Sequence, residues 1–80
     1  MTSAQVRMAR AALNWTVRDL AEATRLHRNT ITNIETGRYA GDIATLAAIA
    51  SVLKRAGVEF IDENGGGPGV RLLKREPKTG

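Results

Sequence analysis

Five polar residues with helical spacing lie near residue 30 and offer the chemistry that recognises a base pair. On a helix, where successive residues turn by about 100°, one polar arc of roughly 140° would hold all of them: Arg28, Asn29, Thr32, Asn33 and Thr36. An arginine can donate two hydrogen bonds to guanine, an asparagine can pair with adenine, and a threonine methyl can contact thymine. The alternative is an ordinary solvated face. Such faces usually mix lysine with glutamate, and because this one has neither, the pattern favours base contacts.

Arg10 and Glu35 carry opposite charges at positions where an unpaired charge would be costly. Arg10 lies among the apolar residues expected to face inward from a first helix, and Glu35 lies at the edge of the inward face of the helix that carries the polar arc. We therefore expect a structural ion pair between them, the alternative being two separate solvated charges. Losing one partner of a buried pair typically costs about 3–5 kcal/mol.

Two capping signals predict the helices that lead to the polar arc. Thr2 and Gln5 have the spacing of a capping box, so a first helix is expected to begin near Ser3. Thr16 and Asp19 have a weaker version of the same pattern and predict a short second helix. The sequence therefore predicts two helices at its start.

A third and a fourth helix are predicted downstream. Ile31 and Ile34 form the inward pair of the third, which Gly37 is expected to end, and a break of about three residues before it matches helix-turn-helix spacing. Asp42 can cap the fourth helix and Gly57 can end it. Its buried stripe is expected to contain Leu46, Ile49, Ala50 and Leu53.

The remaining residues predict a short β-hairpin, with strands over 58–62 and 70–74 joined by a glycine-rich turn. Apolar residues alternate in both strands, so one face, with Val58, Phe60, Val70 and Leu72, should be buried. Two such strands are not stable alone. We expect them to pack on the fourth helix, on a second copy of the chain, or on both.

This pattern divides the chain into a helix-turn-helix domain over 1–57, a hairpin over 58–75 as a possible dimerisation element, and a disordered tail over 76–80. A homodimer would present two third helices about 34 Å apart, which suits a near-palindromic site on double-stranded DNA.

Charge and composition narrow the class of protein. Residues 1–41 contain six arginines and three acids, which suggests a polyanionic partner, although a basic solvated surface explains the charge equally well. The chain has no cysteine and one histidine, so no metal or cofactor is expected. No run of residues is apolar enough for a membrane span, no signal peptide is evident, and we expect a cytoplasmic protein.

No catalytic constellation is apparent in the sequence. It offers no nucleophile with a base beside it and no paired carboxylates, and 80 residues leave little chain to build a pocket. An enzyme and a small-molecule ligand are therefore not expected.

The stretch from Arg10 to Ile49 resembles the Cro/CI-type (XRE) helix-turn-helix family of bacterial and phage repressors. The matching core and turn residues are Leu20, Ala21, Ile31, Ile34, Glu35, Gly37, Thr45 and Leu46. The resemblance implies a mainly α, lambda-repressor-like bundle of four to five helices whose third helix lies in the major groove.

The resemblance also implies roles for individual positions. The base-reading positions are Arg28, Asn29, Thr32 and Asn33, and the phosphate contacts are Thr16, the Val17 backbone N–H, Thr36 and Arg38. Arg10 and Glu35 match a pair that joins the first helix to the third.

This sequence departs from the family pattern at three positions. Val17 replaces a glutamine, which removes a side-chain bond to phosphate. Arg25 stands in the turn where glycine is common, so a residue with a side chain is expected at positive φ. His27 replaces the usual serine or threonine cap of the third helix.

A transcriptional regulator that represses by covering a promoter is the leading hypothesis. The sign of its action is implied by the family rather than by the residues. A DNA-binding antitoxin of a toxin–antitoxin pair belongs to the same class, and a protein-interaction module on the same scaffold is the alternative from a different class.

Overall fold

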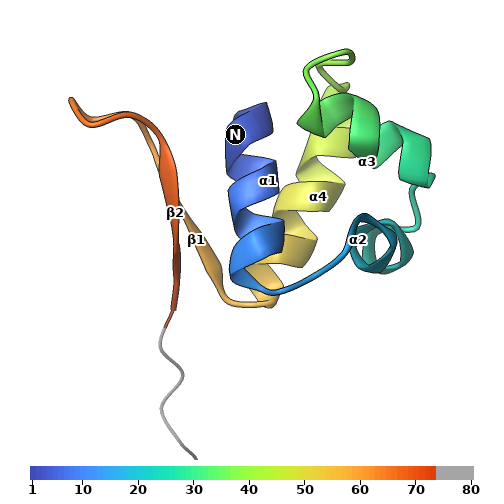
Figure 1. The fold of residues 1–80 in the computed structure, drawn as a ribbon, viewed down its shortest axis with the longest axis horizontal. Helices are drawn as coiled ribbons and strands as arrows, with labels where there is room; N and C mark the ends of the chain where they lie inside the picture. The colour runs from blue at the N-terminus through green and yellow to red at the C-terminus, as the bar shows by residue number, and fades with distance from the viewer. Residues whose placement is uncertain (74–80) are drawn as a thin grey trace, which may run out of the picture.

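Four helices precede one antiparallel hairpin in residues 1–73, the part of the chain that the computed structural model describes (Figure 1). The elements are α1 (Ser3–Ala12), α2 (Val17–Thr24), α3 (Arg28–Glu35), α4 (Ile43–Arg55), β1 (Val58–Ile61) and β2 (Gly69–Leu72). The predicted mainly α bundle with a C-terminal hairpin is confirmed. Within these residues the number of helices is four, the lower of the two numbers expected.

The first helices begin where the capping signals place them. The Gln5 backbone N–H donates to Thr2 Oγ1 at 3.1 Å, and the Thr2 N–H donates to Gln5 Oε1 at 2.8 Å. Thr16 and Asp19 make the same reciprocal pair at the start of α2, with distances of 2.8 and 3.0 Å. Each pair satisfies backbone N–H groups that have no partner within the helix.

Two residues with side chains, Asn14 and Arg25, adopt the left-handed conformation in the turns after α1 and α2. Their φ angles are 59° and 60°. The positive φ expected at Arg25 is thus confirmed, whereas no pattern in the sequence indicated Asn14. Asparagine tolerates this region far better than arginine does, because its short polar side chain can form local hydrogen bonds.

The core lies where the four helices meet, with a contribution from β1. Its largest fully buried side chains, at most 1% exposed, are Val6, Leu20, Ile31, Ile49, Leu53 and Val58. Of the stripe expected on α4, Leu46 and Ala50 are only half-buried. The α4 helix therefore buries a narrower face than the pattern predicted.

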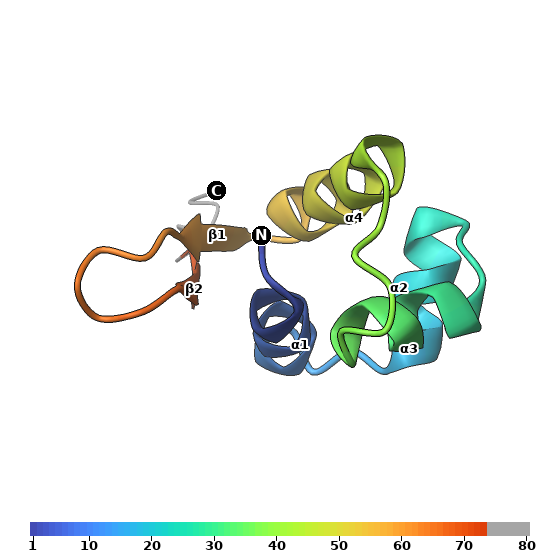
Figure 2. The ribbon, with the colours of Figure 1, turned by 90° about the horizontal axis from the view of Figure 1, so that it is seen from above.

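The hairpin packs beside α1, on the opposite side of the bundle from α2 and α3 (Figures 1 and 2). Phe60 pairs with Val70 and Val58 with Leu72. This register places the four residues on one face, as the alternation predicted. The strands end earlier than expected, at Ile61 and Leu72, and the predicted end at Lys74 lies outside the described residues, as does the tail over 76–80.

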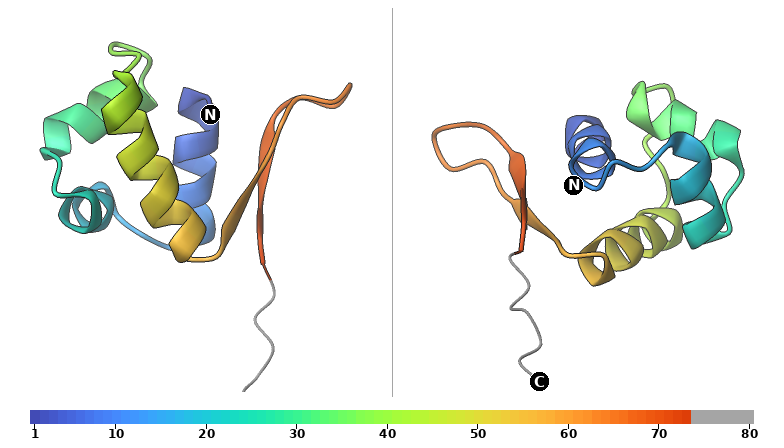
Figure 3. Two further views of the ribbon diagram at one scale, coloured as in Figure 1. Left: turned by 180° about the vertical axis from the view of Figure 1, so that it is seen from behind. Right: turned by 60° about the horizontal axis from the view of Figure 1, so that its bottom comes forward.

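The expectation that Leu72 is buried was wrong. Its partner Val58 is 1% exposed, but Leu72 is 47% exposed. Leu72 is the last residue of β2 and pairs with Val58, the first residue of β1. This end of the hairpin follows directly on the C-terminal end of α4, where that helix stops (Figure 3). Ile61 and Leu73 are 37% and 51% exposed.

Candidate nucleic-acid interface

The α3 helix lies at the edge of the bundle (Figure 2). Its polar arc is turned to solvent. Arg28, Asn29, Thr32 and Thr36 are exposed, and Asn33 is half-buried. On the inward side, Ile31 and Ile34 are at most 3% exposed, so packing fixes the rotation of the helix about its axis. The structure thus brings all the residues predicted to contact bases onto one accessible face.

The side chains of these predicted base contacts have no hydrogen-bond or ion-pair partner within residues 1–73. This holds for Arg28, Asn29, Thr32 and Asn33. Thr36 differs, because its hydroxyl donates to the Thr32 carbonyl at 2.9 Å, which ties the side chain to the last turn of α3. The donors and acceptors of the arc are therefore available to a ligand, and only Thr36 is partly engaged.

His27 caps the start of α3. Its Nδ1 accepts the backbone N–H of Asn29 at 3.0 Å. The imidazole thus takes the role that a serine or threonine oxygen usually has at this position. The departure from the family pattern at His27 leaves the helix start capped.

The residues predicted to contact phosphate lie in two places. Thr16 and Val17 form the start of α2, where Val17 occupies the first helical position, whose N–H has no partner within the helix. Thr36 and Arg38 follow α3 and are exposed. The Val17 side chain packs against the core, so that only its backbone faces a possible anion.

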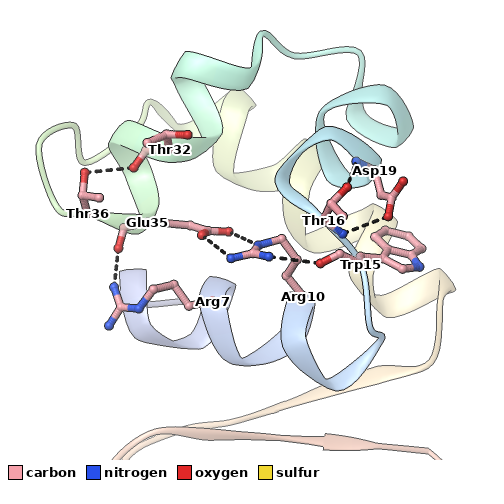
Figure 4. A network of polar contacts seen from close by, with 8 residues as sticks. All are labelled: Arg7, Arg10, Trp15, Thr16, Asp19, Thr32, Glu35 and Thr36. Carbon is pink, nitrogen blue, oxygen red and sulfur yellow. Dashed lines mark hydrogen bonds and ion pairs between the residues drawn. The ribbon is translucent and has the colours of Figure 1, made fainter.

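A polar network joins α1 to the end of α3 (Figure 4). Arg10 donates two hydrogen bonds to the Glu35 carboxylate, from Nε at 2.8 Å and from Nη2 at 3.0 Å. Its third bond, from Nη1, goes to the Trp15 carbonyl at 3.0 Å. The Glu35 side chain is 6% exposed and that of Arg10 is 24% exposed. The hydrogen bond to Glu35 raises the pKa of the Arg10 guanidinium above its ordinary value, so Arg10 stays charged at any working pH.

A helix-turn-helix family model matches residues 6–60 of the chain, more than half of its length. The match begins within α1, covers α2, α3 and α4 completely, and extends through most of β1.

The chain belongs to the Cro/CI-type (XRE) helix-turn-helix family. It is a DNA-binding helix-turn-helix regulator. No curated protein matches the sequence closely enough to add a more specific relative.

Two residues of this family member have roles that the sequence did not reveal. Arg7 donates from Nη1 to the Glu35 backbone carbonyl, which adds a second link between α1 and α3 (Figure 4). Gln5, predicted only as a cap, is 2% exposed and donates from Nε2 to the carbonyls of Ile61 and Gly69, each at 3.0 Å. Since the partners of Gln5 are backbone groups 56 and 64 residues away, no local pattern could have indicated them.

Two other kinds of site are absent from the described part of the regulator. Within residues 1–73 no three His, Asp or Glu side chains gather where they could hold a metal ion. None of the helices in this range has the length and apolar character needed to cross a bilayer.

Proposed function

We propose that this protein is a sequence-specific regulator of transcription that reads the major groove of double-stranded DNA with α3. One observation carries the proposal: α3 presents an exposed face without acids or aliphatic side chains, whose hydrogen-bonding groups have no partner within residues 1–73. Unsatisfied arginine and asparagine groups at helical spacing suit base edges, which offer matching acceptors and donors.

The proposed base contacts come from the outer face of α3. Arg28 binds a guanine, Asn29 and Asn33 pair with adenines or accept from cytosines, and Thr32 contacts a thymine methyl or a neighbouring polar edge. Each good bidentate contact discriminates against the wrong base by about 1–3 kcal/mol. Because the core packing of Ile31 and Ile34 fixes the orientation of α3, these contacts require no folding on binding.

The proposed phosphate contacts hold the helix in the groove. They are the Thr16 side chain and Val17 backbone N–H at the start of α2, and the Thr36 and Arg38 side chains after α3. Such contacts set the register of the protein on the duplex and carry no sequence information. Arg38 has no hydrogen-bond or ion-pair partner among residues 1–73, which supports an intermolecular role.

We also propose a homodimer that forms through the hairpin, which begins at Val58. Ile61, Leu72 and Leu73 expose apolar surface there, between 37% and 51% of each residue. The hairpin and α3 lie at opposite ends of the longest dimension of the molecule, 45 Å. A dimer joined in line through its hairpins would place the two α3 helices farther apart than the separation of about 34 Å, one turn of DNA, expected from the sequence. For such a dimer we propose half-sites about 70 Å, or two turns, apart instead.

Repression follows from occlusion in this proposal. A dimer bound across two half-sites covers the intervening DNA and excludes other proteins from it. Binding to chromosomal DNA would place the protein in the cytoplasm. No small molecule is needed for the binding step.

Selection of bound duplexes from a random pool at fixed salt tests the proposal. The wild-type protein should enrich one sequence in two inverted copies. Arg28→Ala should enrich the same sequence with one position relaxed in each half-site, because only the base under Arg28 loses its contact; the matched control Lys54→Gln lies on α4 and should leave the selected sequence unchanged. Failure of the wild-type protein to enrich any sequence would refute base reading.

A further inference from the structure

A shallow basic concavity lies where α2 ends and α3 begins. Three arginines and one histidine line it against a single acid: Arg18, Arg25, Arg28, His27 and Glu22. The rest of the lining is apolar. With the histidine neutral, three positive charges face one negative charge, so the concavity carries a net charge of +2.

Most of this positive charge is not neutralised by the fold. Arg18 donates from Nε to Glu22 Oε1 at 3.3 Å, but the two side chains are 73% and 68% exposed. Arg25 and Arg28 are also exposed, and neither has a hydrogen-bond or ion-pair partner in the described part of the chain. Two guanidinium groups therefore face solvent at the head of α3, and a third is held only by a weak surface pair.

Arg25 occupies a backbone position that disfavours it. Its φ and ψ are 60° and 27°, the left-handed conformation in which glycine has no steric penalty and a residue with a Cβ does. Its side chain makes no polar contact within residues 1–73 that would compensate. An arginine at this position therefore does not serve the fold, which points to a ligand for its charge.

We propose that Arg25 and Arg18 form a clamp for one phosphate of the DNA backbone, beside the base that Arg28 reads. The inference rests on the proposed function, because Arg28 lines the same concavity and places its contents next to the floor of the major groove. The groove is bordered by phosphates, and the planar fork of a guanidinium matches a phosphate with two parallel hydrogen bonds. The clamp holds the end of α3 opposite to Thr36 and Arg38, so that both ends of the helix are anchored.

Glu22 sets the strength of the clamp. In the free protein its carboxylate occupies Arg18. On binding, Arg18 exchanges that carboxylate for the phosphate, and Glu22 is left close to a like charge. Glu22→Gln should therefore tighten DNA binding.

Arg25→Gly tests the clamp without harming the fold, since glycine adopts the observed φ freely. Binding to the selected duplex is measured by fluorescence anisotropy over a range of salt concentrations. For each protomer bound, the substitution should reduce the salt slope by at most about 0.9 and weaken binding by up to about eightfold at 0.1 M salt, the values for one lost phosphate contact, because Arg18 still faces that phosphate. Arg25→Lys should keep the slope of the wild type, and the matched charge control Lys54→Gln, far from α3, should change affinity by less than about twofold because of screening.

Duplexes with a single neutral methylphosphonate locate the contact. One substituted position in each half-site should weaken binding by the wild type, and it should weaken binding by Arg25→Gly less, because only Arg18 remains to contact that phosphate. If Arg25→Gly keeps the affinity and salt slope of the wild type while Arg28→Ala still relaxes base preference, the clamp is refuted and the proposed function stands. If the wild type selects no duplex at all, the proposed function fails first, and the clamp falls with it.

Discussion

The Arg10–Glu35 pair should couple α1 to α3 strongly, and a double-mutant cycle measures that coupling. Glu35→Leu leaves the Arg10 guanidinium, 24% exposed, without its carboxylate. Arg10→Met leaves a carboxylate that is 6% exposed and also leaves the Trp15 carbonyl without a donor. The double substitution removes both charges and replaces them with apolar groups.

The burial values set the expected magnitudes. Removing one partner of a buried pair costs about 3–5 kcal/mol. Because Arg10 keeps some contact with water, Glu35→Leu should lower the free energy of unfolding by about 3 kcal/mol, the lower end of that range. Arg10→Met should cost at least as much. The double variant should cost only about 1–3 kcal/mol, the penalty of the unpaired Trp15 carbonyl, and thus less than Arg10→Met alone.

Urea unfolding followed by the fluorescence of Trp15, the one tryptophan, gives these free energies. Trimethylamine N-oxide, added equally to all samples, keeps the weakest variants folded. The exposed pair Arg18–Glu22 provides a matched control, and the cycle of Arg18→Met with Glu22→Leu should show a coupling within about 0.5 kcal/mol. A coupling of at least about 2 kcal/mol is expected for Arg10 and Glu35. Equal couplings for the two pairs would refute the structural role of the buried one.

Three further substitutions have outcomes that the structure fixes. Gly41→Ala should destabilise the protein more than Gly37→Ala. Both residues have φ near +80°, but a Cβ at Gly41 would lie 3.0 Å from a leucine side chain, whereas a Cβ at Gly37 would meet nothing within 4 Å. A urea midpoint for Gly41→Ala that is no lower than that for Gly37→Ala would contradict this. Asp42 accepts a backbone N–H that holds the pKa of its carboxyl below the ordinary 3.8, so its stabilisation of α4 is complete above that value and is lost as the pH falls through the lowered pKa. Asp42→Asn caps the helix without titrating. Between about pH 5 and pH 2, roughly the range in which aspartates titrate, its urea midpoint should therefore fall less than that of the wild type. Gln5→Met should cost about 1–3 kcal/mol and speed hydrogen exchange of the hairpin amides, and unchanged exchange would show that Gln5 does not hold the hairpin.

Local rules were sufficient for the helices. Capping oxygens at Thr2, Thr16 and Asp42 marked the starts, and Gly37 and Gly57 marked two of the ends. These signals act within four residues, so the local sequence is enough to predict where these helices begin and end. The face of α3 was predictable for the same reason, because its inward isoleucines and outward polar residues follow from one helical period.

Long-range contacts were predictable only where charge demanded a partner. Arg10 and Glu35 were each costly alone, and so their pairing could be foreseen. Gln5 carries no charge and fits a capping box, and its bonds to the hairpin left no trace in the pattern. The exposure of Leu72 depends on where the helices end relative to β2, which alternation along a strand does not encode.

Replacement of single guanines by 7-deazaguanine tests base reading most directly, because the analogue removes only the N7 acceptor in the major groove. At one position in each half-site the analogue should weaken binding of the wild-type protein, and it should cost Arg28→Ala nothing further at that position. An equal penalty for both proteins at every guanine, or no penalty at any of them, would contradict the assignment of α3 as the element that reads the sequence.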